Sequence, residues 1–387
     1  MNGLNFHGYI SPFQRISHLI THTLASKMVF KKLSLIALSV VLQSTLSQAK
    51  VAGKWFDSIG IIMSENEDFL VTMAQQPFID LASNGTLATN YFGLSHVSEQ
   101  NYVAILAGWL DGDIYRGDAS TPANLNVTYP TILDQLLAQG YTVKQYTESY
   151  PGGCYLADMY PDDPSTALYY KRHSPFNMIT KWRGTSLCED YIGTYDDFAT
   201  DVANNNLPNY FWIIPNDLHN THSADTFVDA NPWTAVEGPK WLTAAKQADA
   251  LFINTWDESR CDNNKYPCTD GKIDQLVATI MWGPMVPKGQ NTTKRWDHFS
   301  VARTVEENWG LTPLNSTGDG NATAFDFLLP NPSAKSVTTG TTSVGNSSDS
   351  SSAGAASTAK ATSSAVKATV SSAIIAMSLL SLSVLLL

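Results

Sequence analysis

A hydroxyl side chain at the start of an apolar segment is the feature of this chain with the clearest chemical potential. Ser98 lies in the run HVSEQNYVAILAG, followed by Glu-Gln-Asn and then by an apolar helical stripe. A serine that opens a helix directs its hydroxyl outward, where the helix dipole favours negative charge, and this suits a nucleophile that attacks phosphate. Serine is also a preferred helix N-cap, so the sequence leaves a purely capping role for Ser98 open.

The elements that must position this serine are short strands and intervening helices. Residues 59–63, 210–215, 250–256 and 278–284 form mainly apolar runs that predict strands buried on both faces. Residues 131–140, with Gly140 as the C-cap, and residues 238–250 have helical patterns. Strands that alternate with helices predict an α/β fold, a three-layer α/β/α sandwich with a mostly parallel sheet.

Polar side chains directly follow three of these predicted strands. Glu65 and Asn66 follow the first, residues 216–222 follow the second, and Asp257 and Glu258 follow the third. Open α/β sheets bind ligands at the carboxyl ends of their strands, so we expect these groups to converge. Their oxygens are hard ligands of the kind that magnesium, calcium or manganese prefers. The alternatives are that Glu65 and Asn66 form a helix cap and that Asp257 and Glu258 lie in a solvated loop.

Seven segments together resemble a known family. They are SENEDF, HVSEQNYVAILAG, YPGGC, KRHSPF, PNDLHNTHSAD, INTWDES and WDHFSVARTVEENWGL. In order and spacing they resemble the phosphoesterase family that contains fungal secreted acid phosphatases and bacterial non-specific phospholipases C, within the alkaline-phosphatase-like superfamily. The resemblance extends from Trp55 to Leu328. It departs from the family at Gln100, where relatives usually have proline, and at Asn220 and Ser223, where they often have aspartate.

The resemblance implies a role for each matched residue. Ser98 would be the nucleophile that is phosphorylated beside a divalent metal ion, and Asn101 would donate to a phosphate oxygen. The metal site would be formed by Glu65, Asn66, Ser98, Asp257 and Glu258. His222 and His298 would bind metal or phosphate, and His173 would hold phosphate or protonate the leaving oxygen. Any one histidine taken alone, as also His96 and His219, is more often structural than catalytic.

The charge balance restricts the partners. The chain has 35 acidic and 24 basic residues, a formal net charge of −11. Such a surface repels nucleic acid, and no basic run suggests a groove for it. Attraction of an anionic substrate must therefore be local to the site. Protonated histidines bind phosphate best below their usual pKa of about 6.5, which favours an acidic optimum.

The two ends have targeting patterns. We interpret residues 1–27 as an upstream extension and residues 28–49, in which Lys31 and Lys32 precede an apolar run, as a signal peptide. Residues 50–330 are one predicted catalytic domain, followed by a disordered Ser/Thr/Ala-rich stalk over 331–372. The apolar tail 373–387 completes a glycosylphosphatidylinositol (GPI) anchor signal, which predicts a secreted protein held on the plasma membrane or transferred to the cell wall. A retained signal-anchor and a tail-anchored helix are the alternatives.

Cysteines and glycosylation sequons fit a secreted glycoprotein. Sequence proximity favours two disulfides in an oxidising compartment, Cys154 with Cys188 and Cys261 with Cys268. Six Asn-x-Ser/Thr sequons are predicted glycan sites: Asn84, Asn126, Asn291, Asn315, Asn321 and Asn346.

These observations favour a surface-anchored acid phosphatase that hydrolyses small phosphomonoesters with help from a divalent metal ion. A phospholipase C-type phosphodiesterase and a non-catalytic cell-wall glycoprotein are the competing hypotheses.

Overall fold

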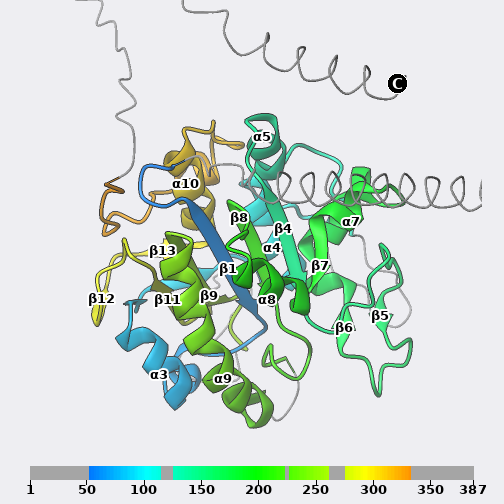
Figure 1. The fold of residues 1–387 in the computed structure, drawn as a ribbon, viewed down its shortest axis with the longest axis horizontal. Coiled ribbons are helices and arrows are strands. Elements are labelled where there is room, and N and C mark those ends of the chain that lie inside the picture. Colours follow the sequence, from blue (N-terminus) through cyan, green and yellow to red (C-terminus); the bar gives the residue numbers. More distant parts are fainter. Residues whose placement is uncertain (1–51, 115–124, 223–225, 261–274, 333–387) are drawn as a thin grey trace, which may run out of the picture. The chain divides into compact units, whose positions relative to one another are not determined.

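An eight-stranded sheet forms the centre of the fold (Figure 1). The computed structural model describes residues 52–114, 125–222, 226–260 and 275–332. The strand order is β12-β2-β11-β9-β1-β8-β4-β7. Strands β9, β1, β8, β4 and β7 are parallel, whereas β11 is antiparallel to both β9 and β2. The strands are β1 (Ser58–Ser64), β2 (Thr86–Ala88), β4 (Val143–Thr147), β7 (Ile192–Thr194), β8 (Tyr210–Ile214), β9 (Ala250–Trp256), β11 (Thr279–Trp282) and β12 (Gln290–Thr292).

The four predicted strands are confirmed as β1, β8, β9 and β11. Every residue in these strands is buried, which explains why their sequences are almost continuously apolar rather than alternating. Two small sheets accompany the central one. They are β10 (Gln275–Leu276) with β3 (Tyr91–Gly93) and β13 (Trp296–Asp297), and β5 (Met159–Tyr160) with β6 (Tyr169–Tyr170).

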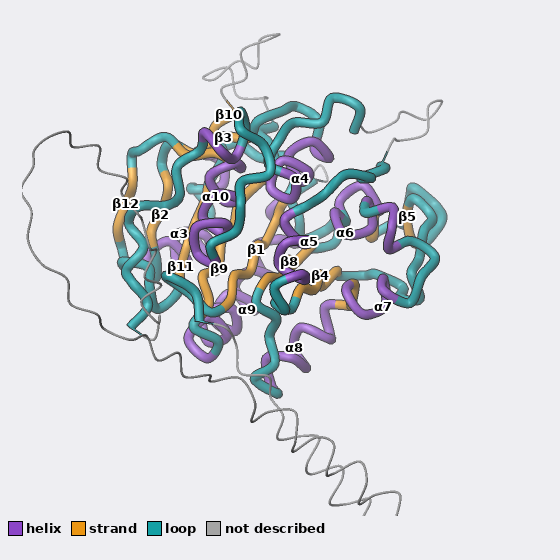
Figure 2. The backbone as a smooth tube through the Cα atoms, turned by 90° about the horizontal axis from the view of Figure 1, so that it is seen from above, coloured by secondary structure: helices purple, strands orange, loops and turns teal. Residues whose placement is uncertain are grey.

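Helices cover both faces of the sheet, so the predicted three-layer α/β/α arrangement is confirmed (Figure 2). One layer contains α3 (Gln76–Ser83), α8 (Tyr195–Ala203) and α9 (Thr226–Gln247); the other contains α4 (Ser98–Ala107), α5 (Ile132–Ala138) and α10 (His298–Trp309). The short helices are α2 (Phe69–Thr72), α6 (Pro175–Met178), α7 (Leu187–Tyr191), η1 (Lys171–His173), η2 (Thr180–Trp182) and η3 (Asp319–Asn321). No helix within the described ranges has the length and hydropathy of a membrane span.

Of the two predicted helices, one matches the structure closely and the other is longer than predicted. The first corresponds to α5, which ends before Gly140, a glycine at φ 83° as expected after a helix C-terminus. The second was predicted too short, because α9 begins at Thr226 and continues through Pro232 and Pro239. Two prolines and a glycine signal a break locally, yet the packing of Trp233 against Trp241, with ring centroids 5.2 Å apart, joins the two halves.

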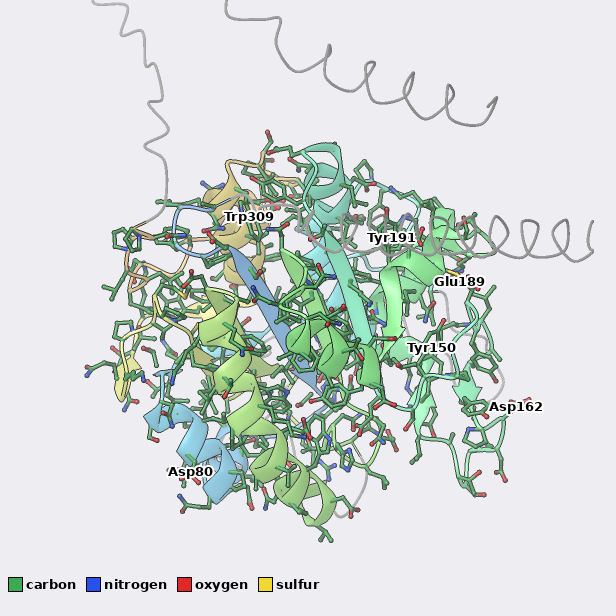
Figure 3. The ribbon with its side chains drawn as sticks, viewed as in Figure 1. Asp80, Tyr150, Asp162, Glu189, Tyr191 and Trp309 are labelled. Atoms are coloured by element: carbon green, nitrogen blue, oxygen red, sulfur yellow. A yellow bond between two sulfur atoms is a disulfide. The ribbon has the colours of Figure 1, made fainter. Side chains whose placement is uncertain are left out.

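The predicted Cys154–Cys188 disulfide is present, with a Cα–Cα distance of 5.7 Å. It ties α7 to the loop after β4, near the β7 edge of the sheet, and Figure 3 labels Glu189 and Tyr191 of that helix. The predicted Cys261–Cys268 pair, the signal peptide, nearly all of the stalk and the C-terminal tail lie outside the described residues.

The described sequons lie at the surface to different degrees. Asn126, Asn291 and Asn321 are exposed, whereas Asn84 and Asn315 are half-buried. The side-chain amide of Asn84 donates to the Asp80 carbonyl at 2.9 Å. The sixth sequon, at Asn346, lies outside the described ranges. Glycosylation of these sites stays a prediction.

Candidate active site

Three loops meet at the carboxyl ends of β1, β8 and β9, as the sequence predicts. The Asp257 amide donates to the Ser64 carbonyl at 3.0 Å, which joins the loops after β9 and β1. The Glu65 amide donates to the Asn220 carbonyl at 2.7 Å, which joins the loop after β8 to the same group. Adjacent parallel strands end at the same edge of the sheet, so residues distant in sequence become neighbours here.

Helix α4 brings Ser98 to this edge. Ser98 is the first residue of the helix, Val97 takes the N-cap position, and no side chain makes a capping hydrogen bond. The Ser98 hydroxyl instead donates to Glu258 Oε1 at 3.2 Å. Ser98 is only 8% exposed, so the expectation of an outward-facing hydroxyl is corrected: it faces a buried carboxylate. The capping alternative does not describe this residue.

The predicted carboxylates lie together in the interior. Glu65 and Asp257 are fully buried and Glu258 is 3% exposed, which excludes a solvated loop for the pair after β9. The side-chain amide of Asn66 donates to Glu258 Oε1 at 2.8 Å. His96 Nδ1 lies 3.0 Å from Glu258 Oε2. Glu258 therefore connects Asn66, His96 and Ser98.

Tyr102 is a site residue that sequence reasoning missed. It lies one turn after Ser98 on α4, is fully buried, and stacks on Trp212 with ring centroids 5.9 Å apart. Its hydroxyl donates to Glu65 Oε1. The i, i+4 spacing from Ser98 places both residues on one face of the helix and could have indicated this role.

The electrostatics of the cluster are unusual because several acidic groups share a buried volume. Burial, the charge of Glu258 and the more distant Glu99 raise the pKa of Glu65 to about 8, against the opposing hydrogen bond from Tyr102. Burial, followed by the charges of Glu65 and Glu258, raises the pKa of Asp257 well above its usual range. Burial and like charge thus favour the neutral forms of both carboxylates.

The donor set fits a hard cation. Buried oxygens of four predicted ligands accept no hydrogen bond from the described residues; these are Glu65 Oε2, Asn66 Oδ1, both Asp257 carboxylate oxygens and Glu258 Oε2. Two of them face a histidine ring nitrogen, Glu65 Oε2 that of His173 and Glu258 Oε2 that of His96. Oxygen atoms without donors in a buried acidic cluster suit magnesium, calcium or manganese. Within the described part of the chain, however, no three His, Cys, Asp or Glu side chains are already arranged around a common metal position.

Two of the predicted histidines face each other beside the cluster. His173 is 3% exposed, and its Nε2 lies 3.4 Å from Glu65 Oε2. Its ring centroid is 5.3 Å from that of His222, whose Nδ1 lies 3.7 Å from Asp217. His173 thus joins the carboxylate cluster directly, and His222 flanks it.

His298 is close to the cluster but engaged on both sides of its ring. Its Nε2 lies 2.6 Å from the Asp257 carbonyl oxygen, and its Nδ1 lies 2.9 Å from the Tyr91 hydroxyl. A carbonyl oxygen only accepts, so Nε2 carries the proton and Nδ1 accepts from Tyr91. Burial lowers the pKa of His298 to about 4, which keeps the ring neutral. In this arrangement His298 orients the Asp257 backbone and offers no ring nitrogen to a ligand.

Two other matched residues have local partners. The Asn101 side chain accepts from the Leu94 and Ser95 amides at 2.8 and 3.1 Å and donates to the Ser95 carbonyl at 2.7 Å. These bonds shape the loop that leads to Ser98. His219 Nδ1 lies 2.8 Å from Glu148, and its ring stacks on Trp233.

Arg260 is a further residue that sequence reasoning did not identify. Its guanidinium donates to the His222 carbonyl at 3.1 Å and to the Thr221 carbonyl at 3.4 Å. Arg260 follows the Asp257-Glu258-Ser259 run directly, so it ties the loop after β9 to the loop after β8. A basic residue two positions after the acidic pair Asp257-Glu258 was the available signal.

The chain is similar in sequence to known acid phosphatases. The chain is 28% identical over 304 residues to a probable acid phosphatase from Kluyveromyces lactis, which covers 76% of this chain and 68% of that protein. It is 27% identical to a phosphate-repressible acid phosphatase from Penicillium chrysogenum, covering 69% of this chain and 62% of that protein, less than two thirds of its length. Among solved structures, a protein of the alkaline phosphatase superfamily from Vibrio parahaemolyticus matches 67% of each chain at 12% identity with a TM-score of 0.43.

The family model for the phosphoesterase family matches residues 58–312, from the first residue of β1 to just beyond α10. This range includes Ser98, the pair Glu65-Asn66, the pair Asp257-Glu258 and every histidine of the site. Because the match covers well over half of the sequence, this chain belongs to the phosphoesterase family.

Proposed function

We propose that this protein is a phosphoric ester hydrolase, an acid phosphatase that cleaves phosphomonoesters with Ser98 as its nucleophile. The observation that carries the proposal is the Ser98 hydroxyl, which makes no capping bond and lies 3.2 Å from Glu258 at the edge of a buried carboxylate cluster. The acid phosphatases among its relatives support the same reaction class. A non-catalytic glycoprotein would have no need to bury carboxylate oxygens that accept no hydrogen bond from the described residues.

The reaction assigns a task to each side chain. Ser98 Oγ attacks phosphorus, the bond from phosphorus to the ester oxygen breaks, and a phosphoserine forms. A carboxylate of the cluster, such as Glu258, accepts the hydroxyl proton. His173 gives its Nδ1 proton to the departing alkoxide, because its Nε2 accepts from Arg172 Nε and carries none. Water then attacks the phosphoserine and regenerates Ser98, releasing inorganic phosphate.

A divalent cation completes the proposed site. Glu65, Asn66, Asp257 and Glu258 would hold it through the oxygens that lack donors, moving together as they do so. When bound, such an ion supplies positive charge to the phosphoryl oxygens and lowers the pKa of a coordinated hydroxyl. Tyr102 keeps Glu65 in position for this role through its hydrogen bond. His298 does the same for the Asp257 backbone.

Ser98→Ala tests the nucleophile. We expect the variant to lose release of p-nitrophenol from p-nitrophenyl phosphate while remaining folded, and acid-quenched wild-type protein to contain phosphate on the Ser98 peptide. Ser95→Ala is the matched control, because Ser95 is equally buried and its hydroxyl contacts only Gln100. Substantial turnover by Ser98→Ala would refute the assignment. A preference for bis(p-nitrophenyl) phosphate would instead favour the phosphodiesterase.

Asp257→Asn tests the cation independently of turnover. Elemental analysis of the purified protein should find a divalent metal in the wild type and much less in the variant. Equal metal content in both proteins, or none in active wild-type protein, would contradict the metal site.

We also propose that the protein is secreted and held at the cell surface by a GPI anchor. The support is the signal-like segment 28–49, the Ser/Thr/Ala-rich segment 331–372, the apolar tail 373–387 and the sequons. A phosphatidylinositol-specific lipase should release the protein from membranes. Retention after that treatment would favour a spanning tail.

A further inference from the structure

Arg172 is a cation beside the candidate site with donor groups that no described residue uses. It lies in η1, which packs against α4, the helix that begins at Ser98. Its Nε donates to His173 Nε2 at 3.2 Å, and its guanidinium carbon lies 4.3 Å from the centroid of the Tyr170 ring. These two contacts fix the orientation of the planar group. Among the described residues, no carboxylate lies within ion-pair distance of Arg172, and its two Nη groups make no hydrogen bond.

The neighbouring basic side chains differ from Arg172 because they are committed to protein partners. Lys171 Nζ lies 2.6 Å from Asp158 and donates to the Leu156 carbonyl at 2.9 Å. Arg260 donates to the carbonyls of Thr221 and His222. Only Arg172, of these three, has a guanidinium edge that a ligand can use without breaking a contact that the structure shows.

Arg172 is linked to the carboxylate cluster through His173. The Nε2 atom of His173 lies 3.2 Å from Arg172 Nε and 3.4 Å from Glu65 Oε2. A phosphoryl group held next to Ser98 and Glu65 would therefore be within the electrostatic influence of this guanidinium.

Phosphomonoesters and phosphodiesters differ in a way that such a group can recognise. The terminal phosphoryl group of a monoester has one more non-bridging oxygen and, near neutral pH, close to one more negative charge than that of a diester. A guanidinium fork matches phosphate geometry with paired hydrogen bonds, whereas an ammonium acts as a point charge.

We propose that Arg172 binds the additional non-bridging oxygen of a phosphomonoester and so makes this site selective for monoesters over diesters. This inference rests on the proposed phosphoesterase function. Arg172 would act in substrate binding, with Tyr170 supporting the guanidinium from one face and His173 fixing its Nε. The same proposal predicts that the Arg172 guanidinium also binds inorganic phosphate, the product of the reaction.

The test compares Arg172→Gln and Arg172→Lys with the wild type on p-nitrophenyl phosphate and bis(p-nitrophenyl) phosphate. We expect the ratio of kcat/KM for the monoester to that for the diester to fall about tenfold or more in Arg172→Gln, since a charge-assisted contact is lost. Arg172→Lys should recover part of the ratio, because it keeps the charge without the fork. Lys171→Gln is the matched control and should leave the ratio within about twofold of wild type.

Direct binding of inorganic phosphate, measured by calorimetry on the full-length protein, separates this inference from the proposed function. We expect the dissociation constant to rise about tenfold in Arg172→Gln but not in Lys171→Gln. A wild-type protein that hydrolyses neither ester but shows this difference would refute the proposed function and leave the phosphate contact standing. An equal loss on both esters, or unchanged phosphate binding in Arg172→Gln, would overturn the role of Arg172, because a merely structural residue would affect both substrates alike.

Discussion

Tyr102→Phe removes one oxygen from the support of Glu65 and leaves the packing of the ring unchanged. The ring of Tyr102 is fully buried and stacks on Trp212, and phenylalanine can keep this contact. The lost interaction is the hydrogen bond from the hydroxyl to Glu65 Oε1. With the proposed cation bound beside it Glu65 is charged, and a hydrogen bond to a charged group contributes about 1.5–3 kcal/mol. If Glu65 must stay in place for turnover, kcat/KM for p-nitrophenyl phosphate should fall about 10- to 150-fold.

The assay compares kcat, KM and thermal stability with those of Tyr146→Phe. Tyr146 is a matched control because it is also fully buried and its hydroxyl donates to a carboxylate, Asp201 Oδ2, at 2.6 Å on the α8 side of the sheet. Both variants should lose stability, since each leaves a carboxylate with one donor fewer, that of Glu65 fully buried and that of Asp201 partly buried. Only Tyr102→Phe should lose activity. Equal kcat/KM for the two folded variants would refute a positioning role for Tyr102.

Two further predictions concern stability away from the site. Burial, reinforced by the charge of Asp319, raises the pKa of Glu306 to about 8. In the unfolded chain its pKa is about 4.3, so between these values the folded protein holds a proton that the unfolded chain releases, and stability falls as the pH rises through this window. The melting temperature of Glu306→Gln should therefore decline less than that of the wild type between about pH 5 and about pH 8, and equal declines would contradict this. Replacing Cys154 and Cys188 together by alanine opens a disulfide with a sequence separation of 34 residues. This should lower the free energy of unfolding by about 3–4 kcal/mol in denaturant titrations, and an unchanged midpoint would show that the bridge contributes nothing.

The sequence by itself determined which chain segments form the site. Four apolar runs are long enough for a strand and have no polar face, so they had to be buried in the sheet. Polar residues placed directly after such runs had to lie at one edge, because parallel strands end there together. Glu65 and Asp257 were predictable for this reason, and the spacing of Ser98 and Asn101 matched the family.

Local pattern was less reliable where tertiary packing opposed it. The first half of α9 contains Pro232, which lowers helix propensity, but contacts such as Trp233 with Trp241 keep the chain helical. The apolar residues of α4 similarly suggested one buried face, whereas almost the whole helix is buried between the sheet and its neighbours. Burial on every side follows from the arrangement of layers, which periodicity within one helix does not encode.

Only the tertiary structure decided which atoms each site residue contacts. His298 was a candidate ligand by its position in the family pattern, yet both ring nitrogens are taken up by Tyr91 and the Asp257 carbonyl. Tyr102 was recognisable only by its i, i+4 spacing from Ser98, and its role comes from the hydrogen bond that it donates to Glu65 in the folded chain. A side chain can rotate toward several neighbours, and residues far apart in sequence supply those neighbours. The partners of these groups are therefore a property of the folded chain, while their presence at the site was already a property of the sequence.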